Sequence, residues 1–133
     1  MSSTLSPDPR RSIGERGERI AERHLIRSGY RILERNFRTR HGEIDLVASD
    51  ARTIVFCEVK TRVDSGRMGV IGPFDSIGPR KRRQVRSMAS GWLQQRPPGR
   101  QRPARDELRF DAIGVTLAPD GQVLRVDHLQ GAF

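Results

Sequence analysis

The sequence contains a single cysteine, Cys57, so an intrachain disulfide and a zinc site built from several cysteines are both excluded. Cys57 lies in an apolar run, where a small buried thiol is more common than a nucleophile. The chain also lacks any apolar run near the ~18 residues of a membrane span, and its start lacks the apolar core of a signal peptide. We therefore expect a cytoplasmic protein that does not enter a membrane.

Lysine is almost absent. Lys and Arg together number 25 in 133 residues, and only Lys60 and Lys81 are lysines. A codon bias toward arginine can explain this excess, but it draws attention to the two positions that keep a compact ammonium group. Acidic residues are fewer, and the net charge at pH 7 is +9. A small domain of this charge typically binds a polyanion, above all nucleic acid, although a merely basic composition is the alternative.

Two stretches have the three- and four-residue spacing of amphipathic helices. The first covers 12–28 and ends at Gly29, as a glycine C-cap predicts, and the second covers about 79–95. Their apolar stripes consist of Ile13, Gly17, Ile20, Ala21, His24 and Leu25 in the first and Val85, Met88, Ala89, Trp92 and Leu93 in the second. Residues 1–11 are polar and proline-bearing, and we expect a disordered tail there.

Five further stretches favour β-strands, with an irregularity in the first near Asn36. They are 30–38, 43–49, 53–62, 108–117 and 122–129, and the second and third are expected to pair as an antiparallel hairpin. In the second strand, Ile44, Leu46 and Ala48 should point to one face and Glu43, Asp45 and Val47 to the other. The order of elements predicts an α/β fold: one domain over 12–133 with a central mixed five-stranded sheet flanked by helices.

Two segments do not fit helices or strands. Residues 63–79 are rich in glycine, and we expect a mobile loop. Residues 96–106 form a basic, proline-rich linker.

The third strand carries charge where a buried strand should not. Glu58 and Lys60 share a face with Ile54 and Phe56, because residues two apart in a strand project to the same side. Burying such charges is costly unless they are paired or bind an ion. A salt bridge between Glu58 and Lys60 at the end of the strand is one explanation.

A bound cation is the other explanation. Hairpin pairing can bring Asp45 beside Glu58, and two neighbouring carboxylates repel each other unless a proton or a cation lies between them. A hard divalent ion such as Mg²⁺ takes oxygen ligands and keeps several waters. A nearby ammonium group, such as that of Lys60, can then orient a metal-bound water or stabilise charge on a phosphate.

The segment "GEIDLVASDARTIVFCEVKTR" resembles the active-site hairpin of the PD-(D/E)xK nucleases, which have the restriction-endonuclease-like fold, and similar arrangements occur in Holliday-junction resolvases. Together with "GERGERIAERHLIRSGYRILERNFR", "RFDAIGV" and the terminal "GAF", it resembles the YraN family of bacterial nuclease-like proteins over roughly residues 14 to 133. No "PD" precedes the hairpin, and "EID" stands in its place. This departure argues against a restriction enzyme as such, but not against a resolvase-like nuclease.

The resemblance implies roles for particular residues. Asp45 and Glu58 would bind Mg²⁺ or Mn²⁺, with the carbonyl of Val59 as a further ligand, and Lys60 would be the catalytic lysine. Glu18 matches the extra carboxylate that resolvase-like members direct at the same site, although an exposed helix glutamate is the simpler explanation. Glu43 can reach the site or cap the turn. Elsewhere, Asp111 can either support the site or pair with an arginine such as Arg109, and His24 is expected to be packed or hydrogen-bonded rather than a ligand.

Nucleic-acid contacts are expected on the second helix and in the basic turn before Gly42. The residues concerned are Arg80, Lys81, Arg82, Arg83, Arg86 and Arg40. Lys81 stands where related nucleases place a polar residue near the scissile phosphate, although a solvated basic face explains it equally. The main hypothesis is a metal-dependent endonuclease that cuts DNA phosphodiesters. The resolvase resemblance implies selectivity for branched DNA, and a homodimer would suit a two-strand cut. The alternatives are a non-catalytic module that binds DNA, RNA or a ribonucleoprotein, and an assembly partner that contacts ribosomal RNA.

Overall fold

The computed structural model describes residues 9–64, 79–95 and 107–133. The tail up to residue 8, residues 65–78 of the predicted loop and the predicted linker 96–106 lie outside the described residues. The elements in chain order are α1 (Pro9–Arg27), β1 (Arg31–Thr39), β2 (Gly42–Ser49), β3 (Thr53–Val63), α2 (Pro79–Gln94), β4 (Glu107–Leu117) and β5 (Val123–Leu129). The predicted element order is confirmed, although α1 begins at Pro9, within the predicted tail.

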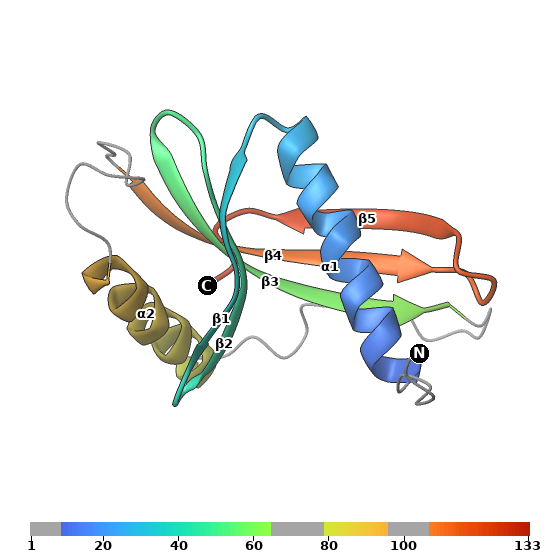
Figure 1. Cartoon of the computed structure of the whole chain (residues 1–133), viewed down its shortest axis with the longest axis horizontal. Coiled ribbons are helices and arrows are strands. Elements are labelled where there is room, and N and C mark those ends of the chain that lie inside the picture. Colours follow the sequence, from blue (N-terminus) through green and yellow to red (C-terminus); the bar gives the residue numbers. More distant parts are fainter. Residues whose placement is uncertain (1–8, 65–78, 96–106) are drawn as a thin grey trace, which may run out of the picture.

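The five strands form one mixed sheet in the order β1-β2-β3-β4-β5. Neighbouring strands are antiparallel except β3 and β4, which run parallel over their whole length. A parallel pair needs a long crossover, and α2 lies in that connection. The α/β fold with a mixed five-stranded sheet is therefore confirmed, and it has the form of the restriction-endonuclease-like fold (Figure 1).

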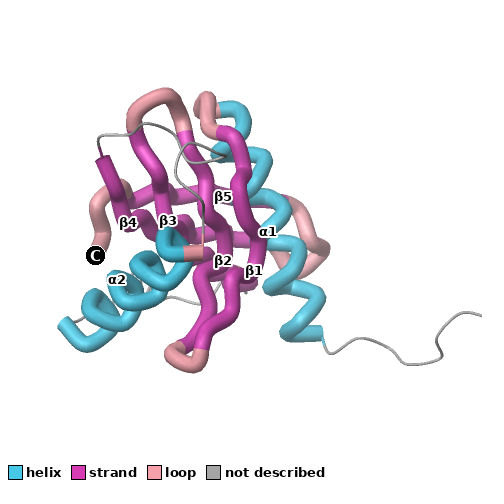
Figure 2. The backbone as a smooth tube through the Cα atoms, turned by 60° about the vertical axis from the view of Figure 1, so that its left-hand side comes forward, coloured by secondary structure: helices cyan, strands magenta, loops and turns pink. Residues whose placement is uncertain are grey.

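The two helices cover opposite faces of the sheet, as Figures 1 and 2 show. Ile54 and Phe56 of β3 pack with α2, whereas Val55 and Cys57 pack with α1, because successive side chains of a strand alternate between faces. Both predicted helix stripes face these cores, and Gly29 ends α1 with a positive φ of 97°. No helix within the described residues is long and apolar enough to cross a membrane.

The hairpin of β1 and β2 separates from the rest of the sheet part-way along. β2 pairs with β3 only from Leu46 to Ser49, whereas it pairs with β1 as far as Gly42. In Figure 1 the hairpin runs across β3 and projects beyond it. Below, this opening between β2 and β3 is called the fork.

The fork overturns one detail of the predicted strand pattern. Ile44 packs in the core under α2, whereas Leu46 and Ala48 pack under α1. The expectation that all three point to one face was therefore wrong. Regular alternation holds where β2 is paired with both neighbours, and it fails where β2 leaves β3 and twists with β1 alone.

A buried polar network joins β4, β5 and α1 on the α1 side. Asp111 is 0% exposed, accepts two hydrogen bonds from Arg109 at 2.9 Å and lies 2.7 Å from Nε2 of His128. Nδ1 of His128 is 3.0 Å from Nε2 of His24, and Arg109 also donates to the hydroxyl of Tyr30. Asp111 therefore has the predicted pairing with Arg109, and His24 is hydrogen-bonded as expected.

Candidate metal centre

Asp45 lies at the fork, where the sheet opens between two strands. Its Oδ2 accepts a hydrogen bond of 2.7 Å from the backbone N–H of Val59, so a side chain of β2 takes the place of a ladder partner for β3. The N–H and C=O of one strand residue face the same side, so the carbonyl of Val59 also faces the fork. This orientation suits the predicted role of Val59 as a backbone ligand.

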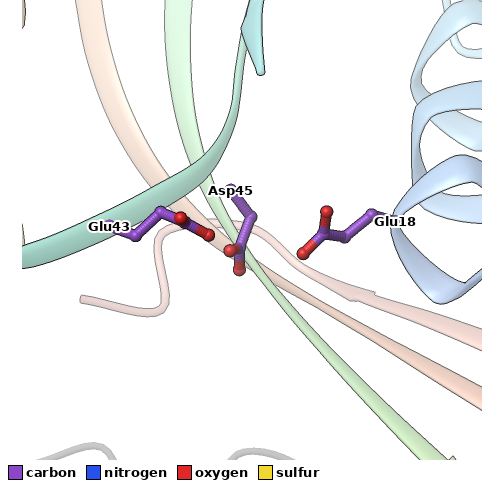
Figure 3. Close-up of side chains that lie close together, drawn as sticks. All are labelled: Glu18, Glu43 and Asp45. Atoms are coloured by element: carbon purple, nitrogen blue, oxygen red, sulfur yellow. The ribbon is translucent and has the colours of Figure 1, made fainter. Parts of the chain in front are cut away.

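Two further carboxylates converge on Asp45. Glu43 comes from the same strand and Glu18 from α1, and one oxygen of each of the three side chains lies within 4.8 Å of the others. Figure 3 shows the three side chains directed toward one another from β2 and α1. These three residues are called the carboxylate cluster.

Close packing of α1 on the sheet brings Glu18 to this position. Gly17 is buried against Thr61 of β3, and a Cβ at residue 17 would lie 2.8 Å from the Cβ of Thr61. A side chain there would push α1 outward and move Glu18 away from Asp45. The second glycine of the "GERGE" segment, Gly17, therefore allows α1 to lie close to β3.

The cluster has a strong electrostatic cost. Burial raises the pKa of Asp45 to about 7, the Val59 N–H opposes this rise, and the charges of Glu18, Glu43 and Glu58 add to it. Burial also raises the pKa of Glu18, and Glu43 and Glu15 contribute in the same direction. Carboxylates that resist ionisation because of burial and one another are suited to a proton or a cation at their centre.

Asn36 of β1 completes the cluster from the solvent side. Arg35 pairs with Leu46 and Phe37 with Ile44, so Asn36 stands opposite Asp45. With its amide nitrogen turned to the carboxylates, it donates to an oxygen of Glu18 at 3.1 Å and to one of Glu43 at 3.2 Å. The reverse orientation would place the amide oxygen against two carboxylate oxygens.

Glu58 and Lys60 occupy the α2 side of the sheet. Oε1 of Glu58 forms an ion pair of 2.8 Å with Lys81 of α2, while its charge still contributes to the raised pKa of Asp45. The side chain of Lys60 is exposed, two residues further along β3. The structure therefore gathers Glu18, Asp45 and Glu43, and places Glu58 close by with Lys81 as its partner.

A pocket of about 630 Å³ opens beside the cluster, between α1 and the β1–β2 hairpin. It is lined by Gly14, Glu15, Glu18, Arg19, Glu22, Arg35, Asn36, Arg38, Glu43 and Leu46. Two of its arginines are held by glutamates: Arg35 by two bonds of 2.7 Å to Glu22, and Arg38 by one of 3.1 Å to Glu43. None of these lining residues is aromatic, so the pocket offers ionic contacts rather than base stacking.

The predicted nucleic-acid-binding residues lie on the other side, on α2 and at the hairpin tip. Arg80 and Arg83 line a second pocket of about 390 Å³ with His41, Gln84 and Ser87, and Nε of Arg40 lies 3.3 Å from Nε2 of His41. Arg82 is exposed. By contrast, Arg86 is 4.9 Å from the ring centre of Phe110 and donates to the carbonyl of Phe133, so it also has a packing role.

Sequence reasoning did not assign Asn36 or His128 to any site. An asparagine inside a strand pattern is a weak signal, since asparagine is depleted in strands, and it indicated only an irregularity. His128 gave no signal, because its partners Asp111 and His24 are distant in the sequence. Glu43 was considered as a ligand, but "EID" alone does not show whether it reaches Asp45.

Comparison with known proteins gives one family. The model described as "Uncharacterised protein family UPF0102" matches residues 17–115, which include the whole carboxylate cluster. A UPF0102 protein of Frankia alni is 43% identical over 122 residues, which cover 92% of this chain and 94% of that protein. Those of Geobacter metallireducens and a Parafrankia species are 44% and 46% identical, over 92% and 91% of this chain and 93% and 95% of theirs.

Proposed function

The chain belongs to the UPF0102 family, which is the predicted YraN family, and from this and the carboxylate cluster we propose that it is a metal-dependent endonuclease acting on nucleic-acid phosphodiesters, above all those of DNA. The single observation that carries the proposal is the convergence of Glu18, Glu43 and Asp45 within 4.8 Å at the fork, beside an arginine-lined pocket.

The donor set fits a hard divalent cation. Mg²⁺ and Mn²⁺ take carboxylate and carbonyl oxygens, and the cluster offers three carboxylates with the Val59 carbonyl directed to the same opening. Burial raises the pKa of Asp45, and the charges of Glu18, Glu43 and Glu58 add to this rise, so a divalent charge at the cluster would favour the ionised form. When bound, such an ion lowers the pKa of water and stabilises charge on a phosphate.

The residues around the cluster have roles that follow from their positions. Glu18, Glu43 and Asp45 would hold the ion, and Glu58 would join them if Lys81 releases it. Lys60, exposed on the same strand face as Glu58, is the proposed catalytic lysine, which would position a proton or stabilise the phosphate.

The substrate is expected to be bound through its backbone. Arg19, Arg35 and Arg38 line the pocket beside the cluster, and Arg80 and Arg83 line the pocket on α2. Arginine contacts to phosphate give affinity without reading sequence, so selectivity would come from the shape of the nucleic acid, for example a branch point. A two-strand cut of this kind would need two active sites, which a homodimer supplies.

A cleavage assay with matched variants tests the proposal. Purified protein is incubated with duplex, single-stranded and four-way-junction DNA in Mg²⁺, Mn²⁺ or chelator, beside Asp45→Asn, Lys60→Ala and the control Asp127→Asn. Asp127 forms an exposed ion pair of 2.8 Å with Arg125 on β5, outside the carboxylate cluster. We expect metal-dependent cuts from the parent and the control, and loss of activity of at least about a hundredfold in the other two. Cutting that persists in Asp45→Asn or in chelator would refute the mechanism.

The pocket on α2 supports a second candidate, a module that binds nucleic acid without cutting it. Arg80 and Arg83 present positive charge there, beside His41 and independently of the carboxylate cluster. Retarded bands without cleavage, unchanged in Asp45→Asn and weakened by Arg80→Ala, would favour this candidate. The same assay with structured RNA would then distinguish a ribonucleoprotein partner from DNA.

A further inference from the structure

Asn36 has a backbone conformation that its place in a strand does not explain. Its φ of 53° is the only positive φ of a non-glycine residue in the described part of the chain, and it falls in the middle of β1. Asparagine accepts the left-handed region better than most residues, yet some free energy is still spent to hold it there. The conformation therefore calls for a reason in the side chain.

The side chain supplies that reason, since the Asn36 amide is a neutral donor between two carboxylates. Its nitrogen is 3.1 Å from an oxygen of Glu18 and 3.2 Å from an oxygen of Glu43. These carboxylates come from different elements, Glu18 from α1 and Glu43 from β2. One NH₂ group has two hydrogens, so a single amide can satisfy both acceptors.

The geometry assigns Asn36 as the positioning residue of the carboxylate cluster: its amide holds Glu18 and Glu43 converged on Asp45 before any cation binds. This inference deepens the proposed function and rests on it only for cation binding. Without the amide, repulsion would let Glu18 turn away on α1 and would leave Glu43 with the 3.1 Å ion pair to Arg38 alone. The ion would then have to assemble its own ligands, and affinity would fall.

Two variants separate this role from simple tolerance of the backbone conformation. Asn36→Gly accepts the positive φ more readily but loses the side-chain amide. Asn36→Asp keeps the shape of the side chain and its tolerance of a positive φ, but it replaces the hydrogen-bond donor by an acceptor. In chelator at pH 7.5, we expect the urea midpoint of Asn36→Asp to lie below those of the parent and Asn36→Gly, because a fourth carboxylate would join Glu18, Glu43 and Asp45. Equal midpoints for Asn36→Asp and the parent would overturn the inference.

Titration calorimetry with Mn²⁺ and with Mg²⁺ provides the second measurement. We expect Asn36→Gly to bind either ion about tenfold more weakly than the parent, as loss of a group that orients ligands usually does, and Asp45→Asn to show no binding at this site. Undiminished affinity in Asn36→Gly would overturn the inference even if the parent binds the ion well. If the parent binds neither ion, the proposed function fails, and the midpoints in chelator still decide whether Asn36 holds the two carboxylates.

Discussion

Replacing Asp45 by asparagine should stabilise the protein at neutral and higher pH when no cation is present. Asparagine keeps the shape of the side chain and an oxygen for the N–H of Val59, but it carries no charge beside Glu18 and Glu43. In the parent, the pKa of Asp45 is raised from 3.8 to about 7, so the folded state holds this proton more tightly than the unfolded state. The contribution of Asp45 to the free energy of unfolding is therefore highest below pH 4 and is lost as the pH rises through 7.

The size of this effect follows from the pKa difference. A difference of roughly three pKa units corresponds to about 4 kcal/mol in total at 1.36 kcal/mol per unit, as an upper value for a partly buried group. At pH 5 less than half of this free energy has been lost. The remaining loss between pH 5 and pH 8 is therefore about 2.5 kcal/mol. The loss should be present in the parent and absent in Asp45→Asn.

Urea unfolding in chelator at pH 5, 6, 7 and 8 measures this difference. Titrating groups far from Asp45 act equally in both proteins. Glu18, Glu43 and Glu58 interact with Asp45, so their coupling to it is part of the difference that the experiment measures. Asp127→Asn, which removes an exposed carboxylate, should follow the parent. Equal pH slopes for the parent and Asp45→Asn would show that burial and the neighbouring carboxylates do not raise the pKa of Asp45.

Three further substitutions or treatments test other parts of the structure. Gly17→Ala should destabilise the fold by about 1–3 kcal/mol, because its Cβ would overlap Thr61. Gly14→Ala has open space around it and should stabilise α1 by about 0.5–1 kcal/mol. Chemical denaturation of both variants checks the contrast. Asp111→Ala should cost about 3–5 kcal/mol in the same measurement, since it leaves a guanidinium and an imidazole without their buried partner. Burial raises the pKa of the Cys57 thiol, so a thiol reagent should react with the unfolded protein but hardly with the native one.

The helices and the carboxylate–lysine strand were predictable because each is encoded by local periodicity. The spacing of Ile20, Ala21 and Leu25 marks the buried side of α1, and the two-residue spacing of Glu58 and Lys60 assigns both to one face. The fold class then follows from the order of such elements. None of these inferences requires knowledge of contacts between distant residues.

The details of the site depend on such contacts. No local pattern shows that β2 is separate from β3 before Leu46, and this separation turns Ile44 to the other core and brings Glu43 to Asp45. The ion pair of Glu58 likewise depends on where α2 places Lys81. Sequence reasoning could therefore propose the carboxylates, but not which of them meet in the absence of a cation.

The fork also has a consequence for self-association. From Glu58 onward, β3 pairs with β4 but with no other described strand, so it presents an internal edge to which another chain could add by hydrogen bonding. Asp45 occupies one backbone donor of that edge, and above pH 7 its negative charge, beside Glu18 and Glu43, would oppose the approach of another strand. The carboxylates that make the site costly to fold are therefore expected to disfavour edge-to-edge pairing between two molecules as well.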